Sequence, residues 1–128
     1  MYKINIENTG GENFKAKSGD HGLTISTQKA EGMGPLDVFL AALGSCVGVY
    51  LRRYLDNAKI PAEHFKINIE ADLEQNASPK RFTHIAVSVD LCNAKFDERR
   101  RDAILEFIKN CPVHNTLKNS PEIAISIK

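Results

Sequence analysis

The groups with the greatest chemical potential in this 128-residue sequence are the thiols of Cys46, Cys92 and Cys111. A cysteine thiolate is a nucleophile, and two thiols that meet can cycle between a reduced pair and a disulfide. Cys46 and Cys111 lie far apart along the chain, so the sequence alone does not show whether they touch. An odd cysteine count without a Cys-x-x-Cys motif argues against a secreted disulfide scaffold.

Each cysteine has a different local setting. Cys46 lies on the apolar face of an expected helix, where it could be either a packed thiol or a reactive one. Cys111 precedes Pro112 and is expected to be the N-cap of a short helix, a position that lowers a thiol's pKa and would make Cys111 the attacking group. Cys92 follows an apolar strand and is expected to be an inert core thiol.

Other polar residues offer weaker chemistry. His114 follows Cys111 by three positions, but the second ligand pair of a structural zinc site is missing, so we expect no metal. Asp37 lies in the first turn of the expected central helix, where a carboxylate complements the helix dipole. The basic run Arg99–Arg101 is interleaved with acids and is expected to be a solvated helix face.

The elements that position these residues follow from periodicity. Apolar residues recur at steps of three and four between Pro35 and about Asn57, which predicts a long central helix. Its small residues, Gly44 and Gly48 among them, permit close approach of another element and also make room for a ligand beside Cys46. Further short helices are expected over residues 97–110 and 111–119. Alternating residues predict strands over 2–7, 14–17, 23–27, 65–71, 82–91 and 122–127, the first three forming an antiparallel meander.

Length and composition predict a single α+β domain over residues 1–128. The net charge of +1 argues against a protein that binds nucleic acid through bulk charge. The weakly polar run over residues 38–51 is shorter than the ~20 residues of a membrane-spanning helix, so we expect a core helix and no membrane. Because the N-terminus has no basic segment followed by an apolar one, we expect a cytoplasmic protein.

Two segments together resemble the OsmC/Ohr family (osmotically inducible protein C and organic hydroperoxide resistance protein). The segment from Gly34 to Cys46, Gly-Pro-Leu-Asp-Val-Phe-Leu-Ala-Ala-Leu-Gly-Ser-Cys, is similar to the family's first cysteine motif. The segment from Cys111 to Leu117, Cys-Pro-Val-His-Asn-Thr-Leu, is similar to its second. Their order and separation and the strand-rich N-terminal lead also fit, so the resemblance covers nearly the whole chain.

The resemblance implies a curved antiparallel sheet packed on a long central helix, in an intertwined homodimer with its active sites at the subunit interface. It also implies a thiol peroxidase that needs neither metal nor prosthetic group. By that analogy Cys46 attacks an organic hydroperoxide, Cys111 resolves the product to a disulfide, and an external dithiol reduces it. This assignment reverses the order that the N-cap argument gives for Cys111.

The sequence departs from the family's pattern at two places. Asp37 stands where family peroxidases have a glutamate, and the resemblance implies a catalytic role for Asp37. No arginine precedes Arg52, although those peroxidases use an arginine from their N-terminal strands. Lys15 and Lys17 lie in that region, but lysine lacks the bidentate fork of arginine. The pattern resembles the OsmC-like branch more than the Ohr branch. The alternative is therefore a small-molecule-binding or redox-sensing protein of this fold without efficient turnover.

Overall fold

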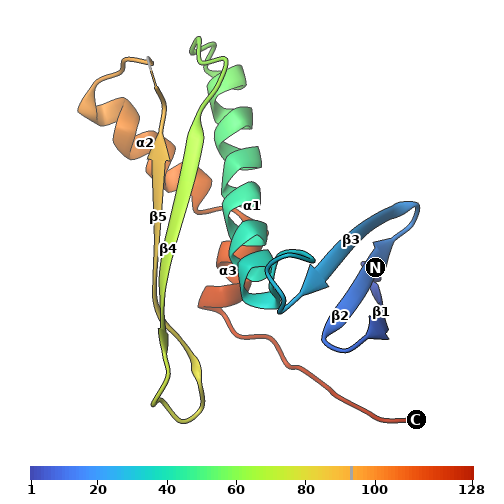
Figure 1. The fold of residues 1–128 in the computed structure, drawn as a ribbon. Helices are drawn as coiled ribbons and strands as arrows, with labels where there is room; N and C mark the ends of the chain where they lie inside the picture. The colour runs from blue at the N-terminus through green and yellow to red at the C-terminus, as the bar shows by residue number, and fades with distance from the viewer. Residues whose placement is uncertain (93) are drawn as a thin grey trace. The chain divides into compact units, whose positions relative to one another are not determined.

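The computed structural model describes residues 1–92 and 94–128 and divides the chain into two compact units, residues 1–42 and 43–128. The boundary falls inside the long helix α1 (Pro35–Asn57). Helices and antiparallel sheets together confirm the α+β class (Figure 1). The assignment of all 128 residues to one domain stays a prediction.

The first unit is built on the expected antiparallel meander. Strands β1 (Asn5–Gly10), β2 (Asn13–Ser18) and β3 (His21–Ser26) pair in sequence order. Gly10 and Gly11 have positive φ angles of 128° and 55°, which explains why glycine occupies the turn after β1. The expected half-burial of the first strand is wrong for the single chain, because Tyr2, Ile4 and Ile6 are all exposed.

The core of the second unit lies on one face of α1. Leu43, Val47, Leu51 and Leu55 recur every four residues, and all four are buried. Strands β4 (Lys66–Glu74) and β5 (Arg81–Asp90) form an antiparallel hairpin. Helices α2 (Glu98–Ile108) and α3 (Pro112–Lys118) follow.

Small residues of α1 allow the β4 strand to approach the helix closely. A Cβ atom at Gly44 would lie 2.8 Å from Cδ1 of Ile69, and one at Gly48 would lie 3.2 Å from Cδ1 of Ile67. The glycines therefore serve helix–strand packing, which confirms the expected close approach of another element, while room for a ligand beside Cys46 stays a prediction.

Helix α1 is long and apolar enough to cross a membrane by length and composition, a test that the core helix of a soluble protein also passes. The length of the apolar run therefore does not exclude a membrane-spanning helix, contrary to the expectation from the sequence. The buried face of α1 packs with Ile104 and Ile108 of α2 in one apolar cluster. This packing is typical of a core helix.

The expected C-terminal strand over residues 122–127 is wrong for the single chain. No regular structure follows α3, and the alternating side chains Ile123, Ile125 and Ile127 are 77%, 89% and 97% exposed. A strand needs a partner for its backbone hydrogen bonds, and this segment has the apolar alternation of a strand without a partner in this chain.

Candidate functional site

Cys46 occupies the middle of α1 and is half-buried. Its helix positions it beside the buried face, and its side chain packs against the apolar cluster of the second unit. The thiol is therefore neither sealed in the core nor freely solvated. This setting fits a thiol that a small molecule could reach.

Cys111 is the N-cap of α3, as the Cys-Pro sequence predicts. Its Sγ accepts the backbone N–H of His114 at 3.4 Å, and Pro112 follows as the first helical residue. The residue is completely buried, with an exposed fraction of 0%. The Cys-Pro pair predicts the N-cap, but the burial of Cys111 depends on the packing of α1 and α2 around its side chain.

The structure brings the two cysteines together, because the side chains of Cys46 and Cys111 share a hydrogen bond. Burial raises the pKa of the Cys111 thiol, and the hydrogen bond with Cys46 raises it further. The N–H groups of His114 and Val113 lower it, but they are outweighed. The expectation of a lowered pKa at the N-cap is therefore wrong, because desolvation exceeds the effect of the helix terminus.

Asp37 has a local partner at the start of α1. Its Oδ2 accepts the backbone N–H of Gly34 at 3.1 Å, and a Cβ atom at Gly34 would lie 3.2 Å from the same oxygen. This contact closes the first turn of the helix, in line with the dipole argument. A catalytic role for Asp37 stays a prediction.

His114 does not complete a metal site. Within residues 1–92 and 94–128, no group of three or more histidine, cysteine, aspartate or glutamate side chains could hold a metal ion. The Nδ1 atom of His114 is buried and has no hydrogen-bond partner among these residues. The histidine instead lines an apolar cavity described below.

Cys92 is not the core thiol that its apolar neighbours predict. It is exposed, and its backbone has a positive φ of 56°, which turns the chain sharply after β5. Its N–H donates to Oδ1 of Asp90 at 2.8 Å. Strand β5 ends at Asp90, and residue 92 differs in parity from Val87 and Val89, so alternation does not extend their apolar face to Cys92.

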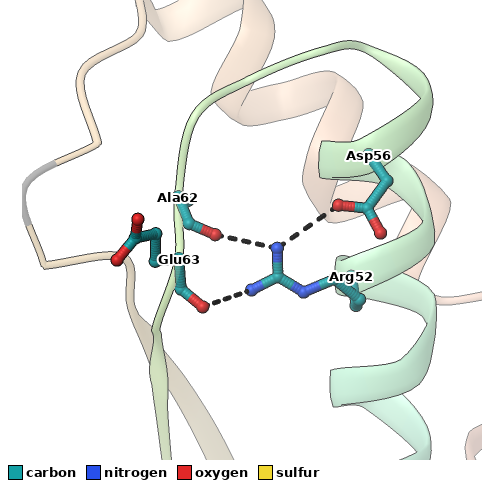
Figure 2. A network of polar contacts seen from close by, with 4 residues as sticks. All are labelled: Arg52, Asp56, Ala62 and Glu63. Atoms are coloured by element: carbon teal, nitrogen blue, oxygen red, sulfur yellow. Dashed lines mark hydrogen bonds and ion pairs between the residues drawn. The ribbon is translucent and has the colours of Figure 1, made fainter.

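Arg52, the first arginine of the sequence, has a structural role (Figure 2). Its guanidinium donates to the carbonyl oxygens of Ala62 at 2.8 Å and Glu63 at 3.1 Å, and it pairs with Asp56 at 3.4 Å. It also lies 5.0 Å from the ring centroid of Phe65. Arg52 thus fixes the connection from α1 to β4.

A cavity of about 790 Å³ lies in the second unit between α1, β5, α2 and α3. Leu43 and Val47 of α1 line it, whereas Cys46 between them does not. The cavity therefore adjoins the helix segment that carries Cys46. Apolar alternation in β5 indicated an apolar face, but nothing in the sequence indicated that space would remain beside it.

Fold and site together define a class of protein: an α+β chain whose long helix places one free cysteine against a second at the start of a short helix. The sequence matches the family described as OsmC-like protein over residues 27–126, and the chain belongs to that family. This confirms the resemblance carried by the two cysteine motifs. No curated protein matches the sequence significantly.

Solved structures share the fold at low identity. An OsmC-like protein from Mycoplasma pneumoniae has a TM-score of 0.82 and 20% identity, over 94% of this chain and 89% of that one. An OsmC-like protein of unknown function from Vibrio cholerae has a TM-score of 0.73 and 13% identity, over 91% and 92%. A Legionella pneumophila protein described as organic hydroperoxide resistance protein OsmC has a TM-score of 0.62 and 18% identity, over 93% and 91%.

Proposed function

We propose that this protein is a thiol-dependent peroxidase that reduces organic hydroperoxides. The observation that carries the proposal is the hydrogen bond between the side chains of Cys46 and Cys111, two free cysteines from distant parts of the sequence. Two thiols in contact are what a peroxidatic and resolving pair requires. The description of the Legionella relative as a hydroperoxide resistance protein supports the same reaction class.

The chemistry has three balanced steps. The Cys46 thiolate attacks the terminal oxygen of R–O–O–H, the O–O bond breaks, and the products are the Cys46 sulfenic acid and the alcohol ROH after proton uptake. Cys111 then attacks the Cys46 sulfur, which forms the disulfide and releases water. An external dithiol reduces that disulfide, restores both thiols and is itself oxidised to a disulfide.

Burial and pKa favour Cys46 as the first nucleophile. Cys111 is completely buried and its pKa is raised, so it is mostly the neutral thiol at neutral pH and has no open path to a peroxide. Cys46 is half-buried and reachable. Once Cys46 is oxidised, Cys111 needs no access to solvent, because the sulfur that it attacks is already its neighbour.

The remaining parts of the proposal concern the partners and setting of the reaction. Asp37 is proposed as a third catalytic residue beside Cys46 and Cys111. The three steps require neither a metal nor a prosthetic group. The functional form is proposed to be a homodimer, since the exposed apolar alternation at Ile123, Ile125 and Ile127 needs a cover. Reduction of the disulfide by a dithiol is consistent with a cytoplasmic location.

A small-molecule-binding or redox-sensing role is the second candidate. It is favoured by the 790 Å³ cavity beside Leu43 and Val47 and by the structural use of Arg52, the first arginine of the chain. In such a protein Cys46 and Cys111 would oxidise once, without repeated turnover.

Peroxide consumption in the presence of excess dithiothreitol separates the two candidates. The peroxidase proposal requires that the wild-type protein consumes cumene hydroperoxide over many equivalents and that Cys46→Ser does not. Cys92→Ser is the matched control, because it removes an exposed thiol outside the pair, and it should retain full turnover. Equal consumption by Cys46→Ser and wild type would refute the proposal.

A further inference from the structure

The cavity between β5, α2 and α3 has the size and wall of a small-molecule site. Its volume of about 790 Å³ lies within the range of roughly 300–1,000 Å³ that is usual for ligand pockets. Aliphatic side chains from α1, β5 and α2 form its wall. They include Val47, Ile85, Val87, Val89, Ile104 and Ile108.

Part of this wall is uncovered. Val87, Leu105 and Leu117 line the cavity and are 38%, 47% and 40% exposed. Burying such aliphatic surface under an apolar ligand would be favourable, because it removes apolar area from water. The wall therefore favours a ligand with an extended apolar portion.

The charged residues of the lining are mostly basic. Arg101, Lys109 and Lys118 line the cavity together with one acidic residue, Asp90, among the part of the chain that is described. Oδ1 of Asp90 already accepts the N–H of Cys92, and Lys109 pairs with Glu106 at 3.1 Å. Arg101 has no ion pair within residues 1–92 and 94–128, so its charge is available to a ligand.

Arg101 also contacts an aromatic residue of the cavity lining. Its guanidinium lies 6.0 Å from the ring centroid of Phe96, which lines the cavity as well. A guanidinium presents two parallel N–H donors that match the two oxygens of a carboxylate. The lining therefore combines an aliphatic wall with a cation.

We propose that this cavity binds a monocarboxylate with a linear apolar tail, its head at Arg101 and its tail along the wall of β5 and α2. The carboxylate pairs with the guanidinium, and the tail covers Val87 and the neighbouring aliphatic side chains. The site is separate from the thiol chemistry, because Cys46 and Cys111 do not line it. Binding therefore does not depend on the proposed peroxidase activity.

Cys92 provides a reporter for the site, because it lines the cavity and its thiol is exposed. Wild-type protein is treated with N-ethylmaleimide, and the rate of modification at Cys92 is followed by peptide mass spectrometry. Decanoate should slow the modification to a plateau. Butyrate, which has the head without the tail, and 1-decanol, which has the tail without the charge, should each protect at least about fivefold less well at the same concentration.

Two variant pairs locate the ligand. Arg101→Gln should weaken decanoate protection about fivefold, the loss expected for an exposed ion pair, whereas Arg99→Gln on the same helix should not, since Arg99 does not line the cavity. Val87→Asp should abolish protection by placing a carboxylate in the wall. Ser88→Asp, one residue along β5 and outside the lining, is its control.

Three results would overturn the proposal. The first is an unchanged Cys92 modification rate up to millimolar decanoate. The second is equal protection of Cys92 by 1-decanol and decanoate, or undiminished decanoate protection in Arg101→Gln. Either result would show that the site does not recognise a carboxylate. The third is protection of Cys92 by raising the protein concentration without decanoate, which would assign the cavity to an interface between copies of the chain. Decanoate protection that persists in Cys46→Ser would separate this site from the peroxidase proposal.

Discussion

At the residue scale, the thiol of Cys111 combines two opposing influences on its acidity. The N–H groups at the start of α3 stabilise the thiolate, whereas complete burial and the hydrogen bond with Cys46 favour the neutral thiol. Burial is the larger influence, so the pKa is raised. A cysteine can therefore cap a helix and still have a raised pKa.

This shift predicts a pH dependence of stability in the reduced protein. The folded-state pKa of Cys111 lies above the unfolded value of about 8.5, so the folded state holds the proton more tightly. The contribution is fully present below about pH 8.5 and is lost as the pH rises through the folded-state pKa. We expect the free energy of unfolding, measured in urea with reductant present, to fall above that pH.

Comparison with variants isolates the thiol from the other groups that titrate at high pH. Cys111→Ala should show a shallower decline in the free energy of unfolding above about pH 8.5 than wild type. Cys92→Ala removes an exposed thiol and should keep the wild-type slope. The same slope in Cys111→Ala and wild type would contradict the account of Cys111.

Local sequence predicted the helix position of Cys111 but not the surroundings of the candidate site residues. The Cys-Pro pair predicted the N-cap at Cys111, because a cap depends on residues adjacent in the chain. The contact of Cys111 with Cys46, its burial and its raised pKa depend on the packing of separate helices, which local patterns do not encode. For Cys92 the deciding feature was one backbone angle after the strand.

At the element scale, α1 was predictable to its first and last residue because its apolar period is long and Pro35 marks its start. The strand over residues 122–127 was not, although its alternation is as regular. A helix satisfies its hydrogen bonds internally, whereas a strand must find them in another segment. Periodicity is therefore enough to predict a helix, whereas for a strand it predicts the apolar face but not the segment that pairs with it.

The close approach of α1 and β4 predicts a size limit at Gly44. Gly44→Ala adds one carbon close to the flexible end of Ile69, which can move away from it. Alanine also gains about 1 kcal/mol of helix propensity over glycine, so the free energy of unfolding should change little. Gly44→Val adds bulk toward both Ile69 and Ile67 and should destabilise the fold by about 1–3 kcal/mol. Urea unfolding measures both, and equal stability of the two variants would contradict the packing.

The connection between α1 and β4 depends on Arg52. Arg52→Ala removes the hydrogen bonds to the carbonyl oxygens of Ala62 and Glu63 and the contact with Phe65, and should cost about 1–2 kcal/mol in the free energy of unfolding. Arg53→Ala is the matched control, since Arg53 contacts only the ring of Tyr50 among the interactions described here, and should cost about half a kcal/mol or less. Equal losses in the two variants would show that the Arg52 contacts do not stabilise the connection.

At the scale of the whole molecule, exposed apolar residues gather at both ends of the chain. Tyr2, Ile4 and Ile6 near the N-terminus alternate with polar residues, and Ile123, Ile125 and Ile127 near the C-terminus alternate with the small residues Ala124 and Ser126. All six large side chains are uncovered in the single chain. Alternation of this kind is typical of strands with one buried face. We propose that a second copy of the chain buries these exposed apolar residues in a homodimer.

Light scattering coupled to gel filtration tests this proposal. Wild-type protein should have twice the chain mass of 14.2 kDa. Ile125→Asp should weaken the dimer at least about tenfold, because a carboxylate would enter the apolar face, whereas Ser126→Asp on the alternate face should not. A wild-type mass of one chain at micromolar concentration, or equal effects of the two variants, would contradict it.

The central claim is that Cys46 and Cys111 form one redox pair, and intact mass with a free-thiol count tests it most directly. After one equivalent of cumene hydroperoxide, the account predicts a chain lighter by two hydrogen atoms, with two of the three thiols lost and Cys92 still free. Neither Cys46→Ser nor Cys111→Ser should show this loss of two hydrogen atoms. Three free thiols at unchanged mass, or a disulfide that includes Cys92, would contradict the account.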